Sequence, residues 1–329
     1  PSHRRPMFNL GELAMKKSLI ALAVLGASGV AMAQSSVTLY GVADAGVGKI
    51  EAGAPAGNDA TDKTQFISGS RMNNGNSRIG VRGVEDLGGG LKAGFNFESG
   101  LDLDDGANLG SGGGFWGRAA NLWLGGNWGT FKMGRTLTPS FYGVAVWELA
   151  GTATYSVIGN KYELAGYGSR NNSQLSYKTP AMGGFSAEIG YILKADNADR
   201  SKVDMNLIYA NGPIGVAVTA NKVKGISTNW SVGGKYSFSN FALAASYTNA
   251  NNLANARRRG FGIGGTATFG AFALTVDLTR DTKNEWTGKK YTNGVVEAKY
   301  ALSKRTFVYG AFLRLDSTNN YGIGVRHNF

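Results

Sequence analysis

The chain has 329 residues, among them 50 glycines and no cysteine, and its formal net charge is +12. The absence of cysteine excludes a disulfide framework and a thiolate metal site. The glycines follow no G-X-Y period, which excludes a collagen-like chain, and the apolar content is sufficient for a large ordered domain.

Residues 15–33, MKKSLIALAVLGASGVAMA, have the three parts of a secretory signal peptide in the right order. Two lysines form a basic start, a short apolar segment follows, and residues 31–33 fit the A-x-A cleavage pattern. We therefore expect residues 1–14 to be an unstructured upstream extension and the mature chain to span residues 34–329. After residue 33 no apolar stretch is long enough for a transmembrane helix.

Alternation of apolar and polar residues is the dominant pattern of the mature chain, and it predicts β-strands. In residues 91–98, LKAGFNFE, every odd-numbered residue is apolar, whereas Lys92 and Glu98 fall on the other face. The same alternation assigns Phe307, Tyr309, Ala311 and Leu313 to one apolar face. The predicted strands cover residues 37–48, 77–84, 91–101, 116–125, 130–135, 170–179, 185–194, 202–211, 214–223, 228–237, 241–249, 259–269, 272–280, 291–301, 306–315 and 320–329.

The connections between these strands alternate between tight turns and longer polar loops, which is typical of an antiparallel meander. A soluble barrel or sandwich would bury its apolar face, whereas an outer-membrane barrel turns that face to lipid and lines a watery lumen with polar groups. Charged residues on strand after strand and strand lengths near ten residues favour the membrane barrel. So do aromatic residues near strand ends, such as Tyr40 and Tyr309. Sixteen strands imply an open channel.

Several segments, in this order, resemble the general porins of Gram-negative bacteria, especially the β-proteobacterial type: SSVTLYGVADAGV, SRIGVRGVEDLGGGLKAGFNFE, GRAANLWLGGNWGTFKMGR and LSKRTFVYGAF. The resemblance implies an all-β, 16-stranded antiparallel transmembrane barrel, assembled as a homotrimer, whose third external loop folds inward. It also implies partners in outer-membrane lipid, lipopolysaccharide and the assembly machinery. The chain ends YGIGVRHNF, in which Tyr321, Val325 and Phe329 look like the assembly signal.

Three arginines should lie at similar heights in such a barrel. Arg78, Arg118 and Arg170 each stand at the start of a strand that descends from the long-loop end, while Arg135 ends an ascending strand and Arg82 lies below Arg78. In porins, arginines at the positions matching Arg78, Arg118 and Arg170 line the constriction opposite an acidic inward loop. Alternation places Arg118 with Leu122 and Leu124, so we expect a β-bulge near residues 119–121.

The inward loop is predicted at residues 136–169, because a connection of this length without strand character is usually functional. Its acidic residues are Glu148 and Glu163, which are candidates to pair with the arginines, but against five nearby arginines they should leave the constriction net positive. A net positive constriction concentrates anions, so small anionic and neutral solutes are the expected cargo. Alternation also predicts lumen-lining charges at Lys92, Glu98, Lys178, Arg314 and Arg326.

Other functions remain open at this stage. An enzyme needs a general base, but the sole histidine of the predicted mature chain is His327, so no nucleophile–histidine pair can be assembled. A channel specific for a sugar, phosphate or organic acid would use aromatic residues of the inward loop, and an adhesive barrel would need longer loops. Those loop aromatics are Phe141, Tyr142, Trp147, Tyr155 and Tyr162. No cofactor, metal or nucleic-acid partner is expected.

Overall fold

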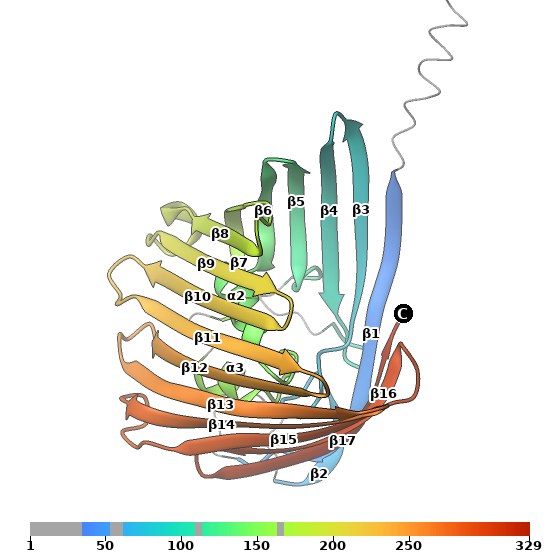
Figure 1. The fold of residues 1–329 in the computed structure, drawn as a ribbon, viewed down its shortest axis with the longest axis vertical. Helices are drawn as coiled ribbons and strands as arrows, with labels where there is room; N and C mark the ends of the chain where they lie inside the picture. The colour runs from blue at the N-terminus through green and yellow to red at the C-terminus, as the bar shows by residue number, and fades with distance from the viewer. Residues whose placement is uncertain (1–34, 53–61, 109–113, 163–167) are drawn as a thin grey trace, which may run out of the picture.

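The computed structural model describes residues 35–52, 62–108, 114–162 and 168–329. The expected upstream extension and signal peptide therefore lie outside the described residues, and so do Gln34 and Glu163. The described chain is a ring of antiparallel strands that encloses two short helices (Figure 1).

Sixteen strands of the described chain form a closed barrel, as the sequence predicts. Strand β1 closes the ring because its first half, Ser36–Val42, pairs with β3 and its second half, Val42–Lys49, pairs with β17. The barrel strands are β1 (Ser36–Lys49), β3 (Arg78–Gly88), β4 (Leu91–Gly100), β5 (Ala119–Gly126), β6 (Gly129–Leu137), β7 (Arg170–Lys178), β8 (Phe185–Ile192), β9 (Lys202–Asn211), β10 (Ile214–Val223), β11 (Asn229–Phe238), β12 (Phe241–Asn251), β13 (Arg257–Phe269), β14 (Phe272–Asn284), β15 (Thr292–Ala301), β16 (Thr306–Leu315) and β17 (Thr318–Asn328).

The observed strand ends depart from the predicted ones where pairing continues into polar sequence. Strand β3 runs to Gly88 rather than residue 84, and the tight turn that follows contains three glycines with positive φ, Gly88, Gly89 and Gly90. Glycine adopts this conformation without steric cost. An additional short strand, β2 (Thr64–Ser68), pairs with the end of β1 inside a segment that the sequence pattern assigned to a loop.

Most strands have an apolar outer face and a polar inner face. In β10, Ile214, Val216 and Val218 are exposed on the outside, whereas Thr219 and Asn221 are buried inside. Exposed rows of large apolar side chains are unfavourable in water and favourable in lipid. The alternation seen in the sequence therefore sorts side chains between lipid and lumen.

Strand β16 is an exception, because its apolar face points into the barrel. The prediction that this face points to lipid was wrong. Tyr309 and Leu313 are buried inside the barrel, with Tyr309 donating a hydrogen bond to Asp44 at 2.6 Å, whereas Phe312 of the opposite face is exposed. The physical reason is a hydrophobic core within the lumen, where the inward loop supplies apolar partners such as Val157. Tyr40 also faces the lumen rather than a lipid interface, because its hydroxyl donates to Glu98 at 3.0 Å.

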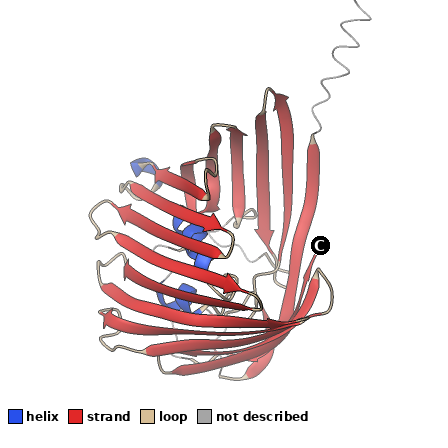
Figure 2. Cartoon of the chain, viewed as in Figure 1, coloured by secondary structure: helices blue, strands red, loops and turns tan. Residues whose placement is uncertain are grey.

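The helices lie within the ring of strands (Figure 2). Helix α2 spans Pro139–Trp147 and packs on β9, β10 and β11, while α3 spans Val157–Tyr162 and packs on β12–β16. A short 3-10 helix, η1 (Lys194–Asp196), follows β8. Among the described residues, no helix is both long enough and apolar enough to cross a membrane.

Candidate functional site: the pore constriction

The connection between β6 and β7 folds into the barrel and carries helices α2 and α3. Helix α2 starts sharply because the Thr138 side chain accepts a hydrogen bond from the Phe141 amide at 3.0 Å and Pro139 occupies the first turn. Ser140 then fixes α2 to the wall, since its amide and its hydroxyl both donate to Asp204 of β9 at 2.7 Å. These contacts hold the first half of the inward loop against β9–β11.

The second half of the loop lies on a glycine-lined stretch of β13. The side chains of Tyr162 and Ile158 occupy the space where side chains would stand at Gly260 and Gly262, and a Cβ at either glycine would come within 3 Å of them. The sequence-based prediction did not identify this glycine-lined stretch as a packing surface for the loop. Its signal was visible in RRGFGIGG, where glycine recurs at alternate positions and would leave the inner face of the strand bare.

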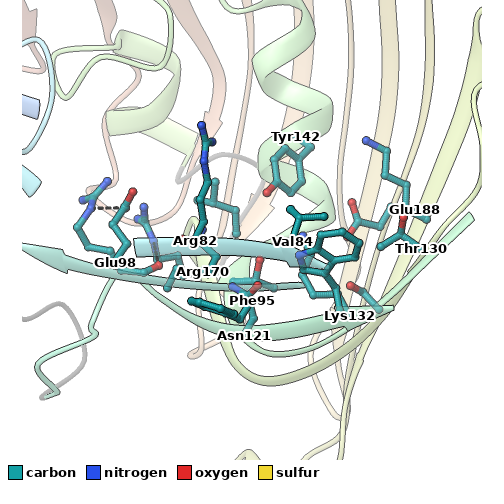
Figure 3. Close-up of a pocket in the computed structure, with 18 of the residues that line it drawn as sticks. Arg82, Val84, Phe95, Glu98, Asn121, Thr130, Lys132, Tyr142, Arg170 and Glu188 are labelled. Atoms are coloured by element: carbon teal, nitrogen blue, oxygen red, sulfur yellow. Dashed lines mark hydrogen bonds and ion pairs between the residues drawn. The ribbon is translucent and has the colours of Figure 1, made fainter. Parts of the chain in front are cut away.

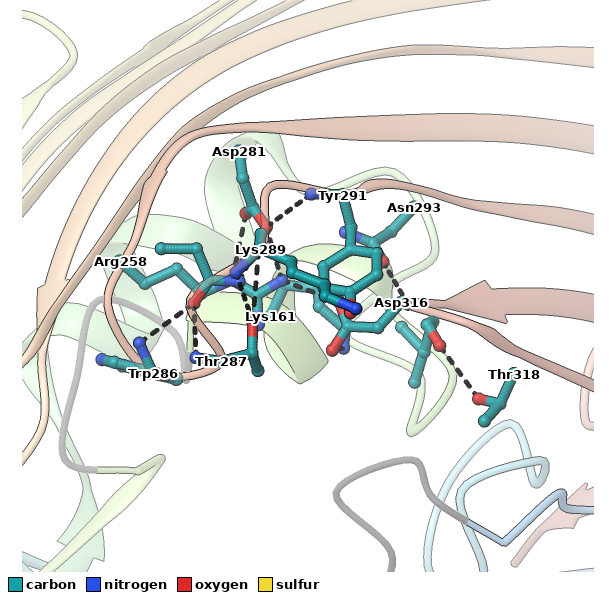
Figure 4. Close-up of polar contacts among 12 residues, drawn as sticks. Lys161, Arg258, Asp281, Trp286, Thr287, Lys289, Tyr291, Asn293, Asp316 and Thr318 are labelled. Carbon is teal, nitrogen blue, oxygen red and sulfur yellow. Dashed lines mark hydrogen bonds and ion pairs between the residues drawn. The ribbon is translucent and has the colours of Figure 1, made fainter.

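A buried ionic network, here called the anchor network, ties α3 to the strand ends at the long-loop end (Figure 4). Lys161 of α3 forms an ion pair with Asp316 at 2.9 Å. Arg258 of β13 pairs with both Asp316 at 2.9 Å and Asp281 at 2.8 Å. The network contains two cations and two carboxylates and is nearly inaccessible to water, so its charges are balanced internally.

Arg78, Arg118 and Arg170, here called the arginine cluster, converge on one part of the lumen. Arg78 and Arg170 are the first residues of β3 and β7, and Arg118 directly precedes β5. The Arg170 Nε donates to the backbone oxygen of Arg118 at 2.8 Å, so the two residues are neighbours. The alignment of these strand starts brings together residues that are far apart in sequence.

Glu98 of β4 lies between two members of this cluster. Its carboxylate is 2.7 Å from the Arg118 Nε and 3.5 Å from the Arg78 Nε, and it also accepts a hydrogen bond from the Tyr40 hydroxyl. The sequence pattern placed Glu98 in the lumen but did not indicate that it pairs with the arginines. Strand register could have shown it, because Glu98 stands opposite Gly80 between β3 and β5.

Two adjoining cavities of about 420 and 430 Å³ lie beside the arginine cluster and share Glu98, Arg118 and Arg170. In Figure 3, Tyr142 projects from α2 into the space between Arg82 and Arg170 on one side and Lys132 and Glu188 on the other. The Arg82 guanidinium lies 5.1 Å from the centre of the Tyr40 ring. The cavity linings hold more basic than acidic side chains.

Of the remaining predicted basic residues, Arg326 and Lys178 line these cavities, whereas Arg135 and Lys92 lie outside their linings. Arg135 donates to the Gly117 backbone oxygen at 2.6 Å and also to Asn172. Arg326 donates to Asn74 at 2.8 Å and lines the second cavity, while Lys178 lines the first. Lys92 is exposed near the short turns, on the same face of β4 as Glu98.

The expected β-bulge in β5 is absent, because β5 pairs in unbroken register with both of its neighbours. Arg118 reaches the lumen because it stands just before the strand begins, where alternation no longer applies. A register shift occurs instead between β6 and β7, at Gly134 and Thr136. Arg135 lies at this irregularity, and so does Ser173 of β7, which has a positive φ of 47°.

Glu148 does not pair with the arginines in the part of the chain that the structure describes. It is 3% exposed and accepts hydrogen bonds from the backbone amides of Ala150 and Thr152 in its own loop. Burial raises the pKa of this carboxyl above its ordinary value. Glu148 therefore closes the end of α2 on the side of the loop that faces the wall.

The prediction that Arg314 lines the lumen was wrong. In β16 it shares its face with Phe312, which is exposed and stands opposite two exposed residues, Val296 and Tyr321. Arg314 therefore points outward. The error follows from the reversal of β16, because alternation gives two faces but does not say which one faces water.

The three residues of the expected assembly signal lie on the outer face at the end of the chain. Tyr321, Val325 and Phe329 are each about half exposed. The Phe329 amide and carbonyl exchange hydrogen bonds with Gly41 of β1 at 3.1 and 3.0 Å. The last residue thus completes the ladder between β17 and β1.

A closed barrel with an apolar outer face, a polar lumen and an inward loop defines a channel-forming outer-membrane protein. The sequence matches the model of the Gram-negative porin family over residues 18–320. The chain belongs to this family. It is accordingly a porin of the Gram-negative outer membrane and not an enzyme.

Individual relatives support the same assignment. The chain is 34% identical to outer membrane porin protein 32 of Delftia acidovorans, over 95% of this chain and 93% of the relative. It is 30% identical to an outer membrane porin of Bordetella pertussis, over 84% of this chain and 72% of the relative. Among solved structures, the anion-selective porin from Comamonas acidovorans superposes with a TM-score of 0.73 at 25% identity, covering 90% of this chain and all of that one.

Proposed function

We propose that this porin is a general diffusion channel with a preference for anions, set by the arginine cluster together with Arg82 and Arg135. The observation that carries the proposal is the composition of the cavity linings, in which Arg78, Arg118 and Arg170 have one carboxylate, Glu98, among them. Two arginines share that carboxylate, so positive charge remains available to a passing solute.

The size of the effect follows from electrostatics. A unit charge about 6 Å from an ion in water contributes about 0.7 kcal/mol, which corresponds to about a threefold change in local ion concentration. Screening limits this influence to about 8 Å at physiological salt, so the effect is confined to the narrow region beside the inward loop. The similar porin from Comamonas acidovorans is anion-selective, which supports the same sign for this chain.

A substrate-specific channel is the second candidate, and the loop aromatics argue against it. Trp147, Tyr155 and Tyr162 are buried between the loop and the wall, so they anchor the loop. Phe141 and Tyr142 line the cavities. Two adjacent aromatic residues do not form a path along which a ring-shaped solute could slide, and this favours general diffusion.

Reversal potentials across planar bilayers in a potassium chloride gradient test the proposal. The expected sign is that of chloride permeation, and its magnitude should fall when the total salt is raised because screening increases. A potassium-selective reversal potential would overturn the proposal. Equal permeability of both ions at low salt would overturn it as well.

We also propose, from family membership, that the chain works as a homotrimer among outer-membrane lipid and lipopolysaccharide, and that residues 15–33 direct export. Tyr321, Val325 and Phe329 are the proposed recognition residues for the assembly machinery. Phe329→Ser should lower the amount of folded protein in the outer membrane, whereas Phe269→Ser, at an exposed position beside a short turn, should not. Unheated gel electrophoresis distinguishes trimer from monomer.

A further inference from the structure

A third cavity lies above the arginine cluster, at the long-loop end of β7–β10. Its volume is about 510 Å³, within the range of small-molecule sites. It shares Arg170 with the two constriction cavities and is otherwise built from different residues. We call it the vestibule pocket, and its lining is Arg135, Arg170, Asn171, Asn172, Ile192, Asp196, Asn197, Ala198, Arg200, Lys202, Val223 and Leu253.

The polar part of the vestibule pocket is strongly basic. Lys202 is 4% exposed and its ammonium group donates to Asn171 at 2.7 Å, so its position is fixed. Arg135 is held by Asn172 at the register shift between β6 and β7, where a bulge redirects side chains from the regular ladder. With Arg170 and Arg200, the lining carries four cations against one carboxylate, Asp196.

The same pocket has an apolar part. Ile192 and Val223 are buried in its floor, at the ends of β8 and β10. Leu253, in the connection between β12 and β13, stands at its rim with 68% of its surface exposed. An exposed leucine beside fixed cations favours an anion that brings its own apolar surface, because covering apolar surface is favourable.

We propose that the vestibule pocket is a capture site for carboxylates that carry an apolar group, and that it delivers them to the arginine cluster through Arg170. This deepens the proposed anion channel and rests on it. A small inorganic anion would use the cations alone, whereas an aromatic or branched carboxylate would use both the cations and Leu253. The pocket therefore adds chemical discrimination before the solute reaches the constriction.

Three probes in planar bilayers test this proposal: benzoate, acetate, which keeps the charge without the ring, and benzamide, which keeps the ring without the charge. Added on the long-loop side, benzoate should reduce the chloride current at concentrations about fivefold to tenfold lower than acetate, since about 40–60 Å² of additional apolar surface would be covered. It should also block at lower concentrations than benzamide, because benzamide lacks the charge that the basic side chains bind. Equal half-blocking concentrations for benzoate and acetate would overturn the proposal.

Two variants locate the effect. Leu253→Ser and Arg200→Gln should each raise the half-blocking concentration of benzoate severalfold while the reversal potential in potassium chloride stays anion-selective. Lys194→Gln, on the exposed η1 helix outside the pocket lining, is the matched control for lost charge and should change neither quantity. Unchanged benzoate block in both pocket variants refutes the vestibule pocket. A reversal potential in potassium chloride that shows no anion selectivity in the unmodified protein refutes the anion-channel proposal instead.

Discussion

Two groups of charged side chains lie inside this barrel, and they differ in their balance of charge. In the anchor network, Lys161 and Arg258 meet an equal number of carboxylates and water is nearly excluded. In the arginine cluster, Arg78 and Arg118 share Glu98 beside open cavities, and Arg170 has no carboxylate partner among the described residues. The balanced group ties α3 to the barrel wall, whereas under the proposed function the unbalanced group keeps positive charge available to solutes.

The largest expected effect comes from breaking the balanced group. Asp281→Asn removes one of the two carboxylates from Arg258 and should destabilise the folded barrel by up to about 3–5 kcal/mol, because the buried network then holds two cations and only one carboxylate. Thermal denaturation in detergent measures the loss, and single-channel recordings should show added current fluctuation as α3 loosens. Lys283→Gln breaks the exposed Lys283–Glu285 pair nearby and should have a much smaller effect, because water screens an exposed pair. Similar losses in both variants would contradict the distinction between the two groups.

The second prediction concerns the unbalanced group. Arg78→Ser with Arg170→Ser should lower the chloride-to-potassium permeability ratio about a hundredfold, because each lost charge lowers the local chloride concentration about threefold and raises that of potassium about threefold. The reversal potential measures it. Lys304→Ser with Arg305→Ser removes the same charge from an exposed turn at the other end of the barrel and should leave the ratio unchanged. A ratio that responds equally to both pairs would mean that net charge, and not position, sets selectivity.

Glu98→Gln should change the selectivity in the opposite direction from the arginine variants. Removing the shared carboxylate should raise the permeability ratio about tenfold, because one more uncompensated positive charge attracts chloride and repels potassium by about 0.7 kcal/mol each. Glu148→Gln is the matched control, since that carboxylate is buried against its own loop and should not act on a passing ion. A larger change in the Glu148 variant would place that group in the solute path.

The smallest expected effect is a dependence on acid. Burial alone would raise the pKa of Asp316, but the ion pairs with Lys161 and Arg258 outweigh burial and hold that pKa below its ordinary value. The stabilisation is therefore complete above the ordinary carboxyl pKa, about 3.9, and is lost as the pH falls through the lower folded value. The acid dependence of the melting temperature should be weaker in Asp316→Asn than in the unmodified chain.

Much of the fold was predictable because a barrel strand is a local pattern. Alternation at residues 214–223 and 241–249 identified strands that the structure confirms almost to the residue. The arginine cluster was also foreseeable, since Arg78 and Arg170 begin strands that run in the same direction. Their mutual approach follows from topology and strand lengths alone.

The remainder depended on contacts between distant segments. Strand β16 turns its apolar face inward because the loop between β6 and β7 covers Tyr309 and Leu313. The local sequence pattern of β16 does not indicate that this loop packs against it. Likewise, Glu148 serves its own helix end instead of an arginine. Alternation shows that a strand has two faces, whereas tertiary packing decides the environment of each.

The split pairing of β1 has a consequence for biogenesis. Because Gly41 forms its ladder bonds with Phe329, the first strand stays half open until the last residue of the chain arrives. The pairing of β1 with β17 therefore joins residues that are farthest apart in the sequence, and contacts of this kind form late and slowly. Until closure, β1 and β17 expose unpaired edges that invite pairing with other chains.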